Sequence, residues 1–118
     1  MVLQPNFGHE RLRRELAGLG LVLVDERLVV ERGRFYAVLV AEPGDHGGVV
    51  SDLDCLVGPH LLERGGPLLT RYLEQELRRC EVEAAGMASA TRSGDPSRAA
   101  ILLRRCALLA EALVKARG

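Results

Sequence analysis

The hydrophobic positions of this chain repeat with a helical period at its start and lose that period soon afterwards. Leu12, Leu16 and Leu19 recur three or four residues apart, with charged residues between them. This spacing predicts an amphipathic helix from about Phe7 to Gly18.

Three short apolar runs follow, at residues 20–24, 27–31 and 34–41, and two-residue polar segments separate them. Connections this short join only antiparallel strands, so the pattern predicts a three-stranded meander. The apolar residues within the runs are consecutive rather than alternating. We therefore expect both faces of the sheet to be covered, by helices or by another subunit.

Residues 49–57, with the sequence VVSDLDCLV, fit two kinds of element. They are compatible with a fourth strand that ends near Asp52, or with a short helix that begins with Ser51 as its N-cap. The apolar start of the segment favours the strand. Gly58 and Pro59 end the element in either case.

Two helices are expected in the C-terminal half, at about Pro67–Ala85 and Pro96–Ala116, each with proline at its first position. Small and polar residues at 86–94 predict a flexible connection between them. The apolar stripe of the last helix is wider than the roughly 100° of a surface helix, which predicts that part of it is buried by a partner. The expected interface residues are Leu102, Leu103, Cys106, Leu109 and Leu113.

Together these elements predict an α+β fold in a single domain spanning residues 1–118. It consists of an N-terminal helix, a three- to four-stranded antiparallel meander and a C-terminal two-helix hairpin. A chain of 118 residues, 47% of them hydrophobic, is about one domain in size.

Charge and cysteine content narrow the functional classes. Sixteen Lys and Arg residues balance sixteen Asp and Glu residues, so no overall field attracts nucleic acid. Aromatic residues, which stack on bases, make up only 3% of the chain, and nucleic acid is therefore disfavoured as a partner. Three widely spaced cysteines indicate reduced thiols in a cytoplasmic protein. No apolar run approaches the ~20 residues of a membrane span.

The candidate chemistry is concentrated around Asp52 and Asp54. Residues i and i+2 of a strand point to the same side, so this pair would place two carboxylates together, as Mg²⁺ sites require. Asp45, His46 and His60 lie nearby in the sequence and complete a candidate metal cluster. None of these residues shows a regular metal-ligand spacing.

The same nine residues resemble motifs of two enzyme families. They are similar to the first motif of haloacid-dehalogenase-like phosphotransferases, but Cys55 and Leu56 replace its Gly-Thr, which excludes that family. They also resemble the S-D-h-D-h-h-V strand of small nucleotidyltransferases. That resemblance implies that Asp52 and Asp54 hold Mg²⁺ against a nucleotide triphosphate, although the Gly-Ser that precedes the family's motif is missing here.

The function predicted from these patterns is a non-catalytic cytoplasmic assembly or adaptor domain without a cofactor. It would bury its apolar helix and sheet surfaces in a homo-oligomer or a larger complex. One alternative is a small metal-dependent phosphoryl- or nucleotidyl-transfer enzyme that uses Asp52, Asp54 and Mg²⁺. A second alternative is a subunit of a nucleic-acid complex with arginine phosphate contacts, for which the candidates are Arg11, Arg13, Arg14, Arg78, Arg79, Arg104 and Arg105.

Overall fold

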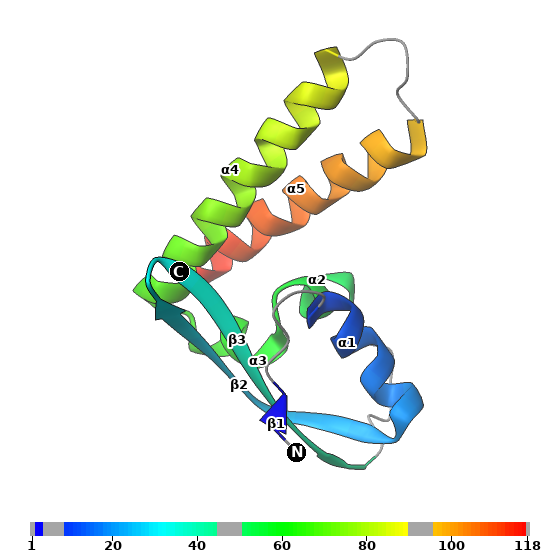
Figure 1. Ribbon diagram of the computed structural model, residues 1–118, viewed down its shortest axis with the longest axis vertical. Coiled ribbons are helices and arrows are strands. Elements are labelled where there is room, and N and C mark those ends of the chain that lie inside the picture. The colour runs from blue at the N-terminus through cyan, green and yellow to red at the C-terminus, as the bar shows by residue number, and fades with distance from the viewer. Residues whose placement is uncertain (1, 4–8, 45–50, 90–95, 118) are drawn as a thin grey trace.

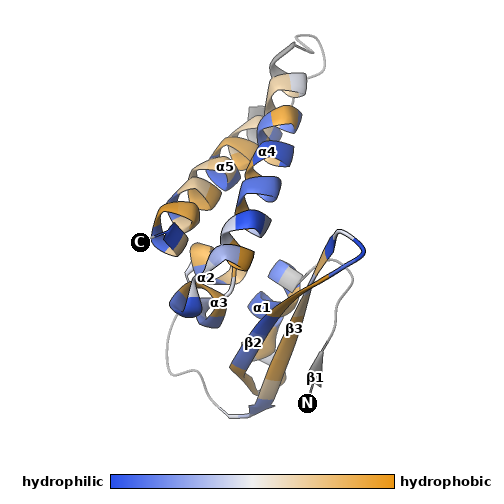
Figure 2. Ribbon diagram, turned by 90° about the vertical axis from the view of Figure 1, so that its left-hand side faces the viewer, coloured by the Kyte–Doolittle hydropathy of each residue, from blue (hydrophilic) through white to orange (hydrophobic). Residues whose placement is uncertain are grey.

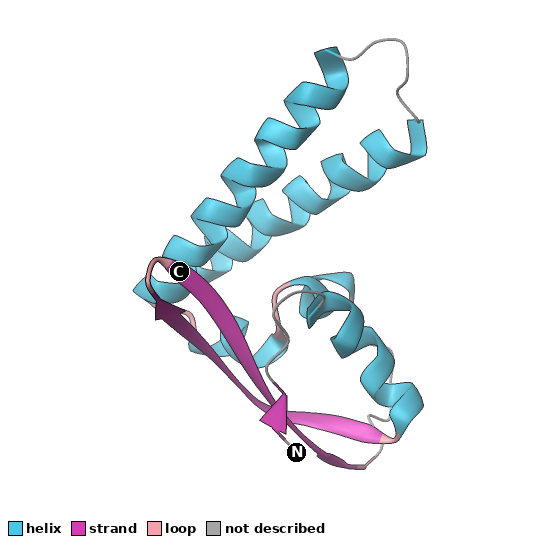
Figure 3. Cartoon of the chain, viewed as in Figure 1, coloured by secondary structure: helices cyan, strands magenta, loops and turns pink. Residues whose placement is uncertain are grey.

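The computed structural model describes residues 2–3, 9–44, 51–89 and 96–117. The molecule has two parts, which Figure 1 shows in one view. The body comprises the described residues up to Arg64 and contains a sheet and short helices. The arm consists of two long helices that project from the body, and the whole measures 47 × 31 × 27 Å. Figure 3 shows that the strands belong to the body alone. The predicted α+β class is therefore confirmed.

The N-terminal helix, α1, runs from His9 to Leu16, and a 3-10 turn at Ala17–Leu19 follows it. Its apolar side packs on the sheet, where Leu16 belongs to a small core with Leu23, Leu39 and Ala41. The predicted helix is confirmed, and Leu12 and Leu16 face this core, whereas Leu19 lies in the 3-10 turn and is 62% exposed.

The sheet is dominated by one long hairpin, formed by β2 (Leu21–Glu31) and β3 (Arg34–Pro43). Arg32 and Gly33 connect them with φ angles of 52° and 77°, as a two-residue hairpin turn requires. A two-residue strand, β1 (Val2–Leu3), pairs with the other side of β3, so the strand order is β1-β3-β2.

The predicted three- to four-stranded meander is not confirmed. The runs at 20–24 and 27–31 are parts of the single strand β2, which crosses Asp25 and Glu26 with a register shift just before them. These two acidic residues were interpreted as a turn. They remain in a strand because each has a basic partner: Glu26 pairs with Arg13 and Asp25 with Arg64.

The strand favoured for residues 49–57 is also wrong for residues 51–57, the part of this segment that the structure describes. Asp52–Leu56 form a short helix, α2, and the Ser51 hydroxyl accepts a hydrogen bond of 3.1 Å from the Asp54 amide. The alternative interpretation, a helix capped by Ser51, is the correct one. A second short helix, α3 (Pro59–Arg64), follows. These segments are helical rather than extended because helices bury Leu53, Leu56 and Leu61 in one apolar core.

The arm is an antiparallel hairpin of α4 (Pro67–Ser89) and α5 (Pro96–Arg117). Both helices begin at the expected prolines. Because α4 continues to Ser89, the connection expected from residue 86 starts later. Figure 2 shows α5 as the more hydrophobic helix of the two. Its apolar side packs on α4, α2 and α3 in the larger core, which includes Leu73, Leu109 and Ala112. None of the described helices is apolar over a sufficient length to cross a membrane.

A buried ion pair joins four elements of the body. Arg13 of α1 and Glu26 of β2 lie 2.6 Å apart, with side chains 2% and 0% exposed. Arg13 also donates to the Cys55 carbonyl at the end of α2, and Glu26 accepts from the His60 amide in α3. Gly58, with φ of 114°, passes so close that a Cβ there would lie 2.7 Å from Arg13 Nη2 and would overlap the Glu26 carboxylate.

We expect Glu26→Gln to destabilise the protein by about 3–5 kcal/mol, because it removes the carboxylate that pairs with the buried Arg13 guanidinium group. The double substitution Arg13→Met/Glu26→Leu should recover much of this loss. Urea unfolding measures both effects. As the control, Glu15→Gln breaks the exposed Arg11–Glu15 pair and should cost less than about 1 kcal/mol. Equal costs for Glu26→Gln and Glu15→Gln would contradict the structural role of the buried pair.

Candidate functional site

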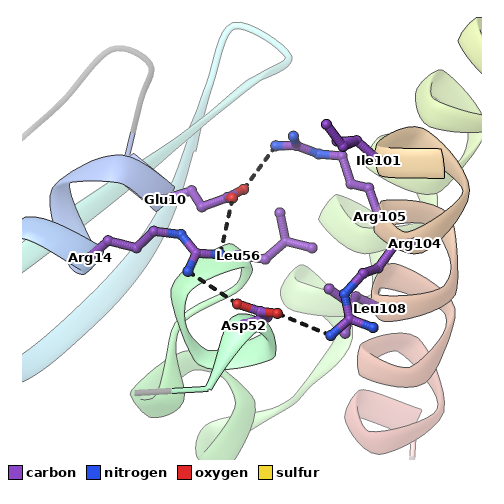
Figure 4. A pocket seen from close by; sticks show the side chains of 8 residues that line it. All are labelled: Glu10, Arg14, Asp52, Leu56, Ile101, Arg104, Arg105 and Leu108. Atoms are coloured by element: carbon purple, nitrogen blue, oxygen red, sulfur yellow. Dashed lines mark hydrogen bonds and ion pairs between the residues drawn. The ribbon is translucent and has the colours of Figure 1, made fainter. Parts of the chain in front are cut away.

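A pocket of about 210 Å³ lies where the body meets the arm, between α1, α2 and α5 (Figure 4). Its lining combines charged groups from all three helices with a few aliphatic side chains. The lining residues are Glu10, Arg14, Asp52, Leu56, Ile101, Arg104, Arg105 and Leu108.

The charged side chains of this pocket form one alternating chain, which is called the ion chain below. Arg105 donates to Glu10 at 3.1 Å, and the other oxygen of Glu10 lies 3.7 Å from Arg14. Arg14 donates to one oxygen of Asp52 at 3.1 Å, and Arg104 donates to the other at 3.0 Å. Three guanidinium groups thus face two carboxylates, and the ion chain carries a net positive charge.

Asp52 is the central anion of the ion chain. The hydrogen bond from Arg104, followed by that from Arg14, holds the pKa of its carboxyl group below the ordinary value. The bond to Asp52 likewise raises the pKa of Arg14. Asp52 therefore stays ionised at neutral pH and is unsuited to donate a proton. The arrangement therefore holds three arginine side chains close together at a solvent-exposed site.

The structure does not bring the candidate metal ligands together. In α2, residues i and i+2 lie about 200° apart around the helix axis, so Asp52 and Asp54 do not share a side. The Nε2 atom of the His60 ring forms a hydrogen bond of 3.0 Å with the Leu23 carbonyl oxygen. Among the residues that the structure describes, no group of three His, Cys, Asp or Glu side chains could hold a metal ion. Asp45 and His46 lie outside the described residues.

The predicted interface residues of the last helix divide into two sets. Leu109 and Leu113 are buried inside the arm, and Leu102 and Cys106 pack partly against the same core. Leu103 is 63% exposed. Much of the surplus apolar surface that suggested a partner is thus covered by α4, α2 and α3 of the same chain.

The arm has an uneven distribution of charge. Helix α5 carries five cations and one carboxylate, whereas α4 carries three cations and four carboxylates. The overall charge of zero hides this difference. Counting charge for each helix separately would have identified α5 as a basic element from the sequence alone. The cations of α5 are Arg98, Arg104, Arg105, Lys115 and Arg117.

Comparison with known proteins identifies similar sequences and structures. The family model described as TrmK, tRNA (adenine(22)-N(1))-methyltransferase, matches residues 1–102. The tRNA (adenine(22)-N(1))-methyltransferase of Bacillus subtilis is 35% identical over 81 residues, which are 65% of this chain and 34% of that protein.

Two solved structures extend the similarity to the fold. The M1A22 tRNA methyltransferase TrmK of B. subtilis superposes with a TM-score of 0.82 and 29% identity, over 95% of this chain and 50% of that one. Streptococcus pneumoniae Sp1610, a putative tRNA (m1A22) methyltransferase in complex with S-adenosyl-L-methionine, superposes with a TM-score of 0.77 and 26% identity. The match covers 95% of this chain and 46% of that one. The chain thus spans about half the length of these relatives, whose folds are Rossmann-like.

These matches correct the function predicted from the sequence. A non-catalytic assembly or adaptor domain is wrong, because the matching family consists of enzymes. The Mg²⁺-dependent transfer alternative is wrong because the family is one of methyltransferases. The expected absence of a cofactor is contradicted by the relative solved with S-adenosyl-L-methionine. Nucleic acid was disfavoured as a partner because charge was averaged over the chain and aromatic residues are few, and the tRNA-directed family overturns that prediction.

The pKa of Asp52 tests the ion chain directly. Because its folded-state pKa lies below the ordinary 3.8, the stabilisation from this group is fully present above that pH. It is lost as the pH falls through the folded-state pKa. In a carbon-detected NMR titration, we expect Arg104→Gln to raise the pKa of Asp52 and Arg98→Gln, on the same helix, to leave it unchanged. If the pKa of Asp52 did not change in Arg104→Gln, the hydrogen bond between Arg104 and Asp52 would be contradicted.

Proposed function

Because the chain belongs to the tRNA (adenine(22)-N(1))-methyltransferase family, we propose that it forms part of an enzyme that methylates N1 of an adenine in tRNA. The family match over residues 1–102 carries this proposal. The related B. subtilis enzyme supports it, and the chain covers 50% of the solved structure of the TrmK enzyme from that organism. The proposal therefore concerns what this half of such an enzyme contributes.

Two pockets among the described residues are too small for a typical cofactor site such as one for S-adenosyl-L-methionine. The ion-chain pocket measures about 210 Å³ and a second pocket, on the arm, about 200 Å³, whereas small-molecule sites usually span roughly 300–1,000 Å³. The arginines and carboxylates of the ion-chain pocket already pair with one another, and in the second pocket Arg79 already pairs with Glu76. We infer that the cofactor is held by other residues and that this half serves the tRNA.

Helix α5 is the part of the structure best suited to contact tRNA. Its five cations lie along one element, and arginine matches the geometry of a phosphate group with two parallel hydrogen bonds. The neutral charge of the whole chain is no obstacle, because salt screens charges beyond about 8 Å and a phosphate responds to the local groups. The ion chain adds Arg14 of α1 to this basic surface.

Asp52 and Glu10 hold the arginines of the ion chain in place without occupying them permanently. These ion pairs are exposed to solvent, with the Asp52 side chain 44% and the Arg104 side chain 66% exposed. Exposed pairs contribute only about 0–1 kcal/mol, so a phosphate group can replace a carboxylate at little cost. The two acids therefore compete with the tRNA for the same guanidinium groups.

Two expectations from the sequence remain part of this proposal. Residues 1–118 act as one domain, which is supported by the apolar core that α2 and α3 share with both arm helices. A cytoplasmic location is compatible with a tRNA substrate.

Opposite effects of two substitutions test the tRNA contact. We expect Arg104→Gln to weaken binding of a labelled tRNA and to reduce the salt dependence of the affinity by about one unit of slope. Asp52→Asn should strengthen binding, because it frees Arg14 and Arg104 for phosphate. Fluorescence anisotropy over a salt series measures both. Arg11→Gln, which removes an arginine of α1 outside the ion chain, is the control. Weaker binding by both variants would show that the ion chain only supports the structure.

The methylation itself can be tested in a chimera, in which this chain replaces the matching half of the B. subtilis enzyme. We expect the chimera to methylate adenine N1, which blocks base pairing and stops reverse transcription at that nucleotide. In this background Arg104→Gln should raise the KM for tRNA and leave binding of S-adenosyl-L-methionine unchanged. A folded chimera that binds the cofactor but does not modify tRNA would contradict the proposed function.

A further inference from the structure

Two cysteines face each other across the arm. Cys106 of α5 donates its S–H to the sulfur of Cys80 in α4, and the two sulfur atoms lie 2.8 Å apart. Cys80 in turn lies 3.4 Å from the Leu102 carbonyl oxygen, which accepts its S–H. The third cysteine, Cys55, is buried in the body.

The pair is close to the geometry of a covalent bond. A disulfide has an S–S length of about 2.05 Å, so the sulfur atoms need to approach by roughly 0.8 Å. Displacements of that size are ordinary for atoms in a folded protein. Both residues lie in the interior of long helices that already pack against each other, well away from the helix ends. The backbone of the arm therefore holds the two thiols together before any reaction.

We propose that Cys80 and Cys106 are a site of reversible oxidation, at which a peroxide converts the two thiols into a disulfide that joins α4 to α5. The sulfur of Cys106 attacks the peroxide, the O–O bond breaks, and Cys106 becomes a sulfenic acid as one water is formed. The sulfur of Cys80 then attacks the sulfur of Cys106, and the S–O bond breaks. A second water leaves with the thiol proton. Two thiols and one hydrogen peroxide thus give one disulfide and two waters.

The surroundings of the two sulfur atoms determine the order of these steps. Cys106 is half-buried, whereas Cys80 is only 5% exposed. Burial, and then the hydrogen bond from Cys106, raise the pKa of Cys80 to about 12, so Cys80 remains a thiol at neutral pH. Cys106 is therefore the sulfur that meets the peroxide, and Cys80 is the one that resolves the sulfenic acid.

A cavity gives this second step access to water. The second pocket, of about 200 Å³, opens onto Cys80 and is lined by Arg79 and Arg105 together with Glu76 and Glu83. The positive charge of Arg105 favours the thiolate form of Cys80 and opposes the effect of burial on its pKa. The thiol proton of Cys80 can leave through this cavity, so Cys80 is not sealed from solvent despite its low exposure.

The disulfide would close a loop within the arm and restrict the unfolded chain. A loop of this size is expected to raise the thermal midpoint by roughly 5–10 °C. The inference depends on the positions and surroundings of the two sulfur atoms. It stands or falls independently of the proposed tRNA methylation.

The test uses the full chain, first reduced and then exposed to hydrogen peroxide in increasing amounts. We expect the number of free thiols to fall from three to one. Peptide mapping after alkylation should join the peptides that contain Cys80 and Cys106, and the thermal midpoint should rise and return after treatment with dithiothreitol. Cys55→Ala, the matched control, should still form the crosslink. Cys106→Ser should prevent it and abolish the shift in midpoint.

Three results would overturn the proposal. One is a chain that keeps three free thiols at peroxide concentrations that oxidise a solvent-exposed cysteine. Another is the oxidation of Cys106 to a sulfinic acid while Cys80 stays free. The last is a crosslink found only between two copies of the chain. Because Cys106 is half-buried, Cys106→Ser is the primary variant, and Cys80→Ser serves only to confirm it.

Discussion

The arrangement of the body depends on the buried ion pair between Arg13 and Glu26. Removing two charges from water is costly, and the cost is offset only where further hydrogen bonds satisfy the remaining polar atoms of both side chains. Here the Cys55 carbonyl accepts a hydrogen bond from Arg13, and the His60 amide donates one to Glu26. One pair thereby orients α1, β2, α2 and α3 relative to each other. It also explains why Gly58 is required, since no side chain fits between the pair and the backbone at that position.

The buried pair also positions the exposed one. Arg14 follows Arg13 in α1, and Asp52 lies in α2, so the contacts of Arg13 bring both residues to the side of α5. Buried and exposed pairs then have different properties. The first is expensive to break and keeps the body rigid, whereas the second is cheap to exchange and can open for a phosphate group. A rigid support beneath exchangeable cations is a suitable arrangement for binding the backbone of a nucleic acid.

Local patterns predicted the elements of this fold where one face of an element is buried. The leucines of α1 and the prolines that open α4 and α5 each belong to a single element, and their spacing was sufficient. The pattern misled where charge and structure disagree. Asp25 and Glu26 have the composition of a turn but lie in β2, because Arg64 and Arg13 neutralise them. The segment VVSDLDCLV has the composition of a strand, but Asp52–Leu56 form a helix because the helix buries Leu53 and Leu56 in a shared core.

By itself, the sequence determined the periodicity of α1, α4 and α5, the turn that joins β2 to β3, and the excess of cations on α5, because these properties belong to neighbouring residues. Only the tertiary structure decided which distant residues meet. Asp52 lies 38 residues from Arg14 and 52 from Arg104, and Cys80 lies 26 residues from Cys106. Such contacts depend on how elements pack, and the packing is the combined result of every buried face. A local pattern contains no record of it.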